Sequence, residues 1–179
     1  MKRSTALSAI VAACIGLTAC TDGNTPASAP KSPRMSPGDT PLLSAGAGFS
    51  QTADTRANIG DFHVQSHFDA FDVELKSHDD TDIEISNQTG AANGSTSGWH
   101  SHPGPVLVLI KSGVATLYDA DGVGCTVRTF SAGSTFIEGT NPHTLRNEGT
   151  VPLEIAAVFF VPSGKPRRIE AAVPATCPP

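Results

Sequence analysis

The chain has 179 residues, a formal charge of −5, and 39% hydrophobic and 16% charged residues. This length allows one domain with tails, and the hydrophobic content excludes wholesale disorder. The 17 glycines and 14 prolines disfavour long helices and coiled coils. No run of Lys and Arg forms a basic stripe, so the sequence excludes a nucleic-acid binder.

Residues 1–19 have the features of a bacterial export signal. A short basic start precedes residues 4–16, which are uncharged and mostly apolar. That stretch is shorter than the roughly 20 residues that cross a bilayer, so it indicates a cleaved signal peptide. The next residues, Leu17-Thr18-Ala19-Cys20, resemble a lipobox, which implies cleavage before Cys20 and lipid attachment to its sulfur. The alternative is a plain secretory signal with an incidental cysteine.

Residues 20–58 are predicted to be a tether between this signal and a folded domain. Five prolines lie among Ala, Ser, Thr and Gly, and Phe49 is the only aromatic residue. Such a segment buries too little apolar surface to fold and behaves as a disordered, extended spacer. Residues 59–179 are therefore predicted to form a single domain, held outside the cell membrane by lipid on Cys20.

Two cysteines remain in the predicted domain, Cys125 and Cys177. An even pair in an exported chain indicates a disulfide, because oxidising compartments allow disulfides to persist. A metal site or a redox pair is the alternative, although no Cys-x-x-Cys spacing supports it. The disulfide would attach the proline-rich C-terminus to the domain.

The domain sequence is typical of many short strands. Apolar and polar residues alternate over short stretches, whereas residues 106–110 are a continuous apolar run, as in a strand buried on both faces. No window shows a convincing helical period, and turn residues separate the runs. Short strands at regular spacing indicate an all-β sandwich or barrel. Strands are expected at 62–64, 71–75, 83–85, 106–110, 114–118, 126–130, 135–137, 143–145 and 155–161.

Three histidines carry the strongest chemical signal. His100 and His102 are two residues apart on a predicted strand, so their side chains share a face and can enter a barrel interior. His143 arrives on a different strand and can complete a three-nitrogen face on one metal ion. Neutral imidazoles suit divalent Fe, Mn, Zn, Ni or Cu. A barrel whose histidines are satisfied by hydrogen bonds, without metal, is the alternative.

Two motifs around these histidines resemble those of the cupin superfamily. They consist of Gly94, His100, His102 and Gly113, and of Gly133, Phe136, Pro142, His143 and Asn147. The resemblance covers residues 59–169. It implies a single-domain jelly-roll-like β-barrel in which the three histidines are metal ligands.

The chain departs from the superfamily pattern at one ligand. Cupins usually carry a Glu six residues before the glycine of the first motif, and that position is Val106 here. Three outcomes are open: a three-histidine site like those of thiol and diketone dioxygenases, a contribution from Glu138, or a metal-free pocket. Glu138 could act as a ligand or general base, or stay on the solvated rim. Tyr118 is a second candidate acid or base, unless its hydroxyl is only structural.

A further resemblance is to one group of proteins within the superfamily. Residues 99–105, 111–113 and 118–119 are similar to those of small exported cupin-domain proteins of actinobacteria. We therefore expect an exported, membrane-tethered metal-binding protein, either a dioxygenase-like metalloenzyme or a non-catalytic lipoprotein that binds a metal or small ligand. The expected partners are a small molecule and, through the lipid, the membrane. A homodimer is left open.

Overall fold

The computed structural model describes residues 46–178, except the side chains of 52–54. All regular secondary structure in this range is β, as predicted. The described part of the chain has no helix long and apolar enough to cross a membrane. The signal, Cys20 and residues 20–45 of the predicted tether lie outside the described residues.

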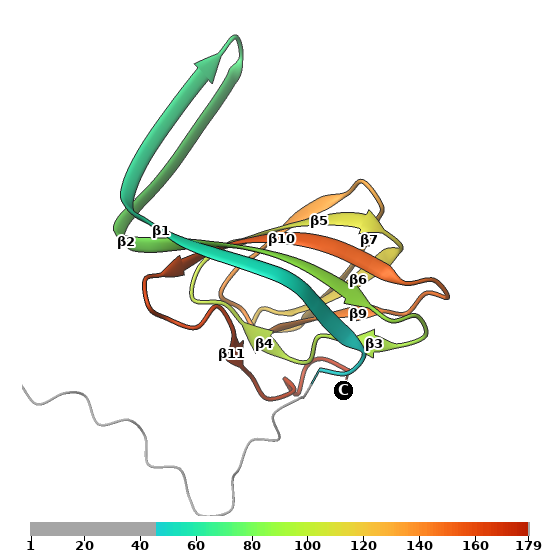
Figure 1. The fold of residues 1–179 in the computed structure, drawn as a ribbon. Coiled ribbons are helices and arrows are strands. Elements are labelled where there is room, and N and C mark those ends of the chain that lie inside the picture. Colours follow the sequence, from blue (N-terminus) through green and yellow to red (C-terminus); the bar gives the residue numbers. More distant parts are fainter. Residues whose placement is uncertain (1–45, 179) are drawn as a thin grey trace, which may run out of the picture. The chain divides into compact units, whose positions relative to one another are not determined.

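The strands form two antiparallel sheets that face each other (Figure 1). The first sheet has the order β1-β2-β10-β5-β8 and the second has the order β11-β4-β9-β6-β7, with β3 paired to β9. The first sheet consists of β1 (Phe49–Phe68), β2 (Phe71–Gly90), β10 (Leu153–Pro162), β5 (Val106–Ser112) and β8 (Thr135–Glu138). The second consists of β11 (Ile169–Glu170), β4 (His100–Ser101), β9 (His143–Asn147), β6 (Val114–Ala120) and β7 (Cys125–Ser131), with β3 at Ser95–Thr96.

The core lies between the two sheets and follows from alternation along the strands. On β5, Val106, Val108 and Ile110 are at most 2% exposed, whereas Leu107 and Leu109 are 45% and 42% exposed. Burial of each inward side chain contributes about 1.5–3 kcal/mol. The prediction that residues 106–110 are buried on both faces is therefore wrong. Only the inner face of β5 is covered by described residues.

The first strand begins earlier than the sequence pattern suggested. β1 starts at Phe49, so residues 49–58, expected in the tether, form part of the first sheet. They pair with β2 from Phe49 opposite Gly90 onward, and Phe49 packs against the core. This edge strand is held mainly by backbone hydrogen bonds, which leave no strong hydrophobic pattern in the sequence.

β1 and β2 continue past the rest of the first sheet as a two-stranded ribbon (Figure 1). β10 pairs with β2 only from Thr81 to Gly90. Beyond that point, Phe62–Phe68 and Phe71–Ser77 pair only with each other among the described residues. The turn between them contains Asp69, whose φ of 51° is in the left-handed region that Asp tolerates better than most residues. We call residues 61–79 the arm.

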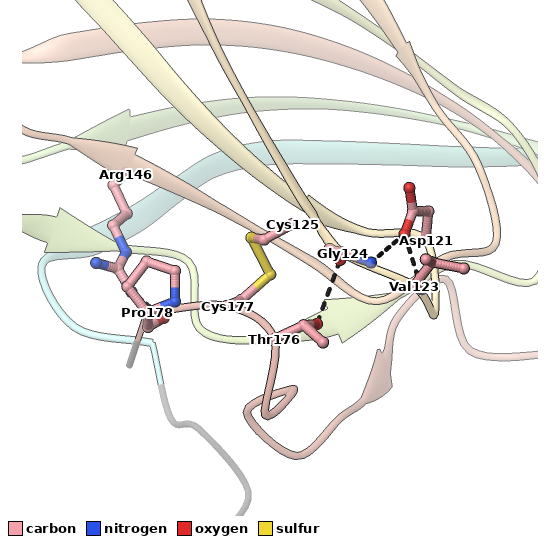
Figure 2. The surroundings of a disulfide bond; sticks show 8 residues. All are labelled: Asp121, Val123, Gly124, Cys125, Arg146, Thr176, Cys177 and Pro178. Carbon is pink, nitrogen blue, oxygen red and sulfur yellow. Dashed lines mark hydrogen bonds between the residues drawn. A yellow bond between two sulfur atoms is a disulfide. The ribbon is translucent and has the colours of Figure 1, made fainter.

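The expected disulfide between Cys125 and Cys177 is present (Figure 2). It fixes the C-terminal segment against the second sheet, where Cys177 packs in a small buried cluster with Trp99 and Ala120. The Thr176 hydroxyl donates a 3.2 Å hydrogen bond to the Gly124 carbonyl beside it. The covered surface is the outer face of the sheet that carries two of the histidines.

Candidate metal centre

The three predicted histidines converge inside the barrel. His100 begins β4, His143 begins β9, and the two are directly paired across the strands. His102 follows β4 and shares the inward direction of His100. All three side chains are buried, and one ligating nitrogen from each lies within 4.8 Å of the other two. The sequence-based prediction of this cluster is confirmed.

Each ring is oriented by a hydrogen bond on the side away from the cluster. In every case Nδ1 donates to a backbone carbonyl, so Nδ1 carries the proton and Nε2 presents its lone pair. Metal-bound histidines are commonly held in this way, because the bond fixes both tautomer and ring direction. The accepting carbonyls are those of Gly98 at 2.7 Å from His100, Arg167 at 2.6 Å from His102 and Asn141 at 2.8 Å from His143.

A carboxylate completes the cluster, and it comes from Glu138 on β8. Its Oε2 lies 3.3 Å from Nε2 of His102 and 3.6 Å from Nε2 of His143. The side chain is only 8% exposed, so the solvated-rim alternative is wrong. Glu138 is the direct cross-strand partner of Val106, which also points inward, as predicted. We call His100, His102, His143 and Glu138 the histidine centre.

The inward atoms of the histidine centre are electron-pair donors facing one another. Among the described residues, Nε2 of His102 and of His143 has no hydrogen-bond partner. Two buried imidazole lone pairs directed towards a carboxylate repel it unless a cation lies between them. A proton or a metal ion can fill that role. Three neutral nitrogens and one carboxylate oxygen are a donor set suited to a divalent transition metal.

The pKa values of the histidine centre depend on two opposing effects, burial and the charge of neighbouring groups. Burial lowers the pKa of His100 to about 3, with a further contribution from the charge of His143, so this ring is neutral at pH 7. Burial also opposes the charged form of His143, but the nearby Glu138 carboxylate outweighs it and raises the His143 pKa. Burial disfavours ionised Glu138, yet the adjacent rings of His102 and His143 hold its pKa well below the usual range. The Glu138 carboxylate therefore favours a protonated His143 ring when no metal is bound.

The centre opens into a cavity of about 50 Å³. Such a volume holds a metal ion and a few ligand atoms or waters, but no large substrate. Most of the inner wall is apolar, with Phe159 as its only aromatic residue. The polar side chains at its border, besides the centre itself, are those of Gln51, Gln88, Ser97, Arg167 and Arg168.

Arg167 also contributes to the site, although its sequence context did not predict this. Its carbonyl orients His102, and its guanidinium lies 4.9 Å from the Phe159 ring centroid and forms an ion pair with Glu84. The arginine therefore links the loop after β10 to both the ligand and the cavity wall. The only signal was a pair of arginines close after the last long apolar run, which gave no indication of a contact with His102.

Tyr118 lies outside the centre, which corrects the expectation that it could serve as acid or base there. Its neighbour Leu117 points into the core, so alternation on β6 turns Tyr118 to the outer face. Its hydroxyl donates a 2.7 Å hydrogen bond to Glu148, which raises the Tyr118 pKa, and the Arg146 guanidinium lies 4.6 Å from the ring centroid. Tyr118 therefore has a structural role.

A family model described as a cupin domain matches residues 89–176, which include the three histidines and Glu138. Together with the two-sheet fold, this match shows that the chain carries a domain of the cupin superfamily. The domain match ends just before the second disulfide cysteine, and β1 and most of β2 precede it. No significant match was found among curated proteins.

The solved structures that match this chain are distant in sequence. A deletion mutant of Bacillus subtilis oxalate decarboxylase has 12% identity and a TM-score of 0.43, over 49% of this chain and 23% of that one. An oxalate oxidase has 19% identity and a TM-score of 0.42, over 49% and 45%. A cupin superfamily protein of Desulfitobacterium hafniense has 13% identity and a TM-score of 0.39, over 60% and 78%. The chain thus matches less than half the length of either oxalate enzyme.

Proposed function

We propose that this cupin domain binds one divalent transition metal ion, with the Nε2 atoms of His100, His102 and His143 and an oxygen of Glu138 as ligands. The observation that carries the proposal is the convergence of three buried histidine nitrogens, two of which lie beside the carboxylate of Glu138. Each histidine has its proton on the outer nitrogen, so no group of the centre can donate inward at neutral pH except through an added proton. A metal ion replaces that proton and relieves the repulsion.

The proposed metal is Fe, Mn, Zn, Ni or Cu, since the donors are imidazole and carboxylate. When bound, such an ion supplies a Lewis-acid site, and Fe, Mn or Cu also supplies redox chemistry of the dioxygenase type. The protein's own contribution is to orient three rings, to exclude bulk water by the apolar wall, and to hold or accept a proton at Glu138 Oε2. Because the cavity is small, a reacting molecule can place only a few of its atoms beside the metal.

A non-catalytic metal-binding or ligand-binding function is the second candidate. It is favoured by the volume of about 50 Å³ and by the absence of a further acid or base, other than Glu138, among the described side chains that line the cavity. The metal proposal is common to both candidates. Turnover of a small molecule by the metal-loaded protein, lost when the metal is removed and regained when it is returned, separates the enzyme from the binding protein.

The metal is tested by elemental analysis of the full chain purified without a histidine tag. We expect close to one metal ion per chain, and His102→Ala should lose most of it because only two imidazoles and one carboxylate remain. His63→Ala is the matched control: His63 is half-exposed on the arm, bonded to Glu74 at 2.8 Å, and its loss should leave the metal content unchanged. A parent without metal, also after incubation with each candidate ion, would contradict the proposal.

We further propose that the protein is exported and lipid-anchored on the outer side of the cell membrane. The support is the lipobox at Leu17–Cys20 together with the Cys125–Cys177 disulfide, since disulfides are rare in reducing compartments. The metal site would then face the cell exterior.

A further inference from the structure

The arm needs a covering surface that the described residues do not supply. Its two strands pair only with each other, and a two-stranded hairpin alone is marginally stable in water. Residues directly opposite in such a pair point to the same face. The arm therefore has two faces, and the residues on each can be assigned from the strand pairing.

One face of the arm is polar and the other is apolar. The polar face carries the opposed pairs His63–Lys76, Gln65–Glu74 and His67–Asp72. The apolar face carries Val64 opposite Leu75, which are 56% and 49% exposed, and Phe68 opposite Phe71, which are 73% and 61% exposed. Four large apolar side chains thus stand in solvent on one side of the ribbon, with Phe62 and Val73 on the same face.

A second uncovered apolar surface lies on the outer face of the first sheet. Antiparallel sheets with a solvated face normally present polar side chains there. Here Ile85, Leu107, Leu109 and Ile137, from three different strands, are 48%, 45%, 42% and 64% exposed. A contiguous apolar area of this kind marks an interaction site. We call these four residues the sheet patch.

The arm and the sheet patch meet in a groove of about 440 Å³ at the base of the arm. Phe62 of the arm and Phe160 of β10 form its inner end, with ring centroids 6.3 Å apart. Leu75 lines it from the arm, and Leu107 and Ile137 line it from the sheet. The apolar surface is therefore continuous from the arm tip to β8.

One wall of the groove is a loop that is adjacent in sequence to the histidine centre. Pro103, Gly104 and Pro105, directly after the ligand His102, form part of its wall. A Cβ atom on Gly104 would lie 2.1 Å from the Phe160 carbonyl oxygen, so only glycine allows the loop to pack this closely on β10. Whatever fills the groove contacts the segment that positions His102.

We propose that two copies of this chain form a two-fold dimer in which each arm lays its apolar face on the sheet patch of the other copy. One two-fold operation covers both surfaces of both copies, which is the closed arrangement of most homodimers. Large apolar side chains have about 150–200 Å² of surface each, so eight that are about half-exposed offer on the order of 600–800 Å². A stable interface takes about 800 Å² from each partner, so the available area is of the right size.

Charge favours a second copy over a membrane as the occupant. The arm contains five acidic residues and a single lysine, and its polar face is partly acidic. Anionic headgroups would repel such a ribbon, since membrane surfaces attract basic segments instead. The sheet patch instead offers uncharged apolar side chains to the apolar face of the arm.

The test is sedimentation velocity of the full chain in a non-ionic detergent that keeps its N-terminal segment soluble. We expect a dimer. Val64→Asp on the arm and Leu109→Asp on the sheet patch should each weaken dimerisation at least a hundredfold, because each places one charge in both apolar contacts of the dimer. The controls, Gln65→Asp on the polar face of the arm and Thr129→Asp on exposed β7, should remain dimers. Unchanged metal content and circular dichroism would show that the variants are folded.

Mixing the two variants distinguishes an exchanged arm from other dimers. In a mixed dimer, one contact joins a parental arm to a parental sheet patch, whereas every contact in either homodimer contains one aspartate. The other contact of the mixed dimer holds both aspartates, so an equimolar mixture of Val64→Asp and Leu109→Asp should recover part of the parental dimerisation. A monomeric parent, dimers unaffected by both substitutions, or no recovery on mixing would each overturn the proposal. Capture of a monomeric parent by lipid vesicles, lost in Val64→Asp, would assign the arm to the membrane instead.

Discussion

Glu138 and Val106 are direct partners in the β5–β8 pairing, which places a carboxylate beside the position of the usual cupin Glu. The usual cupin Glu position holds Val106, which is buried and apolar. Directly opposite, on β8, Glu138 sends its carboxylate to within 3.3 Å of His102. Cross-strand partners have Cβ atoms about 4.5–5.5 Å apart, a distance that a Glu side chain spans. The carboxylate therefore enters the same space from the neighbouring strand.

This pairing predicts that a carboxylate at position 106 can replace the carboxylate at position 138. Glu138→Gln should lower metal affinity at least tenfold if Glu138 is a ligand, because a neutral amide oxygen replaces a charged one. The double variant Val106→Glu/Glu138→Val restores one carboxylate to this pair and should recover most of the affinity. Both are measured by titration of the metal-free protein.

The single variant Val106→Glu is the control for the double variant. It places two carboxylates side by side in a buried site, where like charges disfavour each other, so the variant should be less stable without metal than the double variant. Equal metal affinity in the parent and Glu138→Gln, with no gain in the double variant, would show that Glu138 is not a ligand.

At the residue scale, the side chains whose direction depends on alternation along one strand could be predicted from the sequence. His100 and His102 are two apart, and this spacing sufficed to place both rings in the interior. Glu138 remained open because its role depends on the register between β8 and β5, which are separated by two other strands in the chain. Tyr118 was misplaced because both faces of β6 are apolar at that point, one towards the core and one towards the C-terminal segment.

At the scale of elements, the C-terminal segment depends on a single covalent link. Between β10 and the C-terminus, the only strand in the described residues is the two-residue β11. The Cys125–Cys177 disulfide closes a sequence separation of 52 residues. Such a cross-link reduces the conformational entropy of the unfolded chain. The segment also covers Trp99, next to the ligand His100.

Cys177→Ser should therefore lower the free energy of unfolding by about 4 kcal/mol, the value for a loop of this length in the chain-entropy model. Chemical denaturation measures it. Treatment of the parent with a reductant should reproduce the loss, whereas the variant should not respond to the reductant. A variant as stable as the oxidised parent would show that the link contributes nothing. Metal content at room temperature should persist, because the carbonyls that orient His100 and His143 lie outside this segment and that of Arg167, which orients His102, lies near its start, before β11.

Strands with a buried face were predictable, and strands without one were not. β10 has the strict alternation of a half-buried strand, and its apolar run was recognised. The first ten residues of β1 carry little apolar pattern, because their pairing with β2 depends on backbone groups that any sequence offers. The length of the arm was equally hidden, although its alternating segments were recognised as strands, since nothing in a local pattern says which partner a strand has.

At the scale of the whole molecule, charge does not attract the protein to an anionic bilayer. The chain is acidic, with a formal charge of −5, so anionic headgroups do not attract it. The proposed membrane location therefore depends on the lipid on Cys20. A thioether-linked diacylglycerol provides two acyl chains, and two chains suffice for stable anchoring where one does not.

Cys20→Ser should consequently abolish both lipid attachment and cleavage by the lipoprotein peptidase. In cells fed a labelled fatty acid, the parent should carry the label and fractionate with membranes, and the variant should stay unlabelled at the mass of the precursor. Cys14→Ser is the matched control, because Val11-Ala12-Ala13-Cys14 has a similar pattern but follows a much shorter apolar stretch. This control should be labelled like the parent. A Cys20→Ser protein that matures and fractionates like the parent would show that residues 1–19 are a plain secretory signal or that the anchor lies elsewhere.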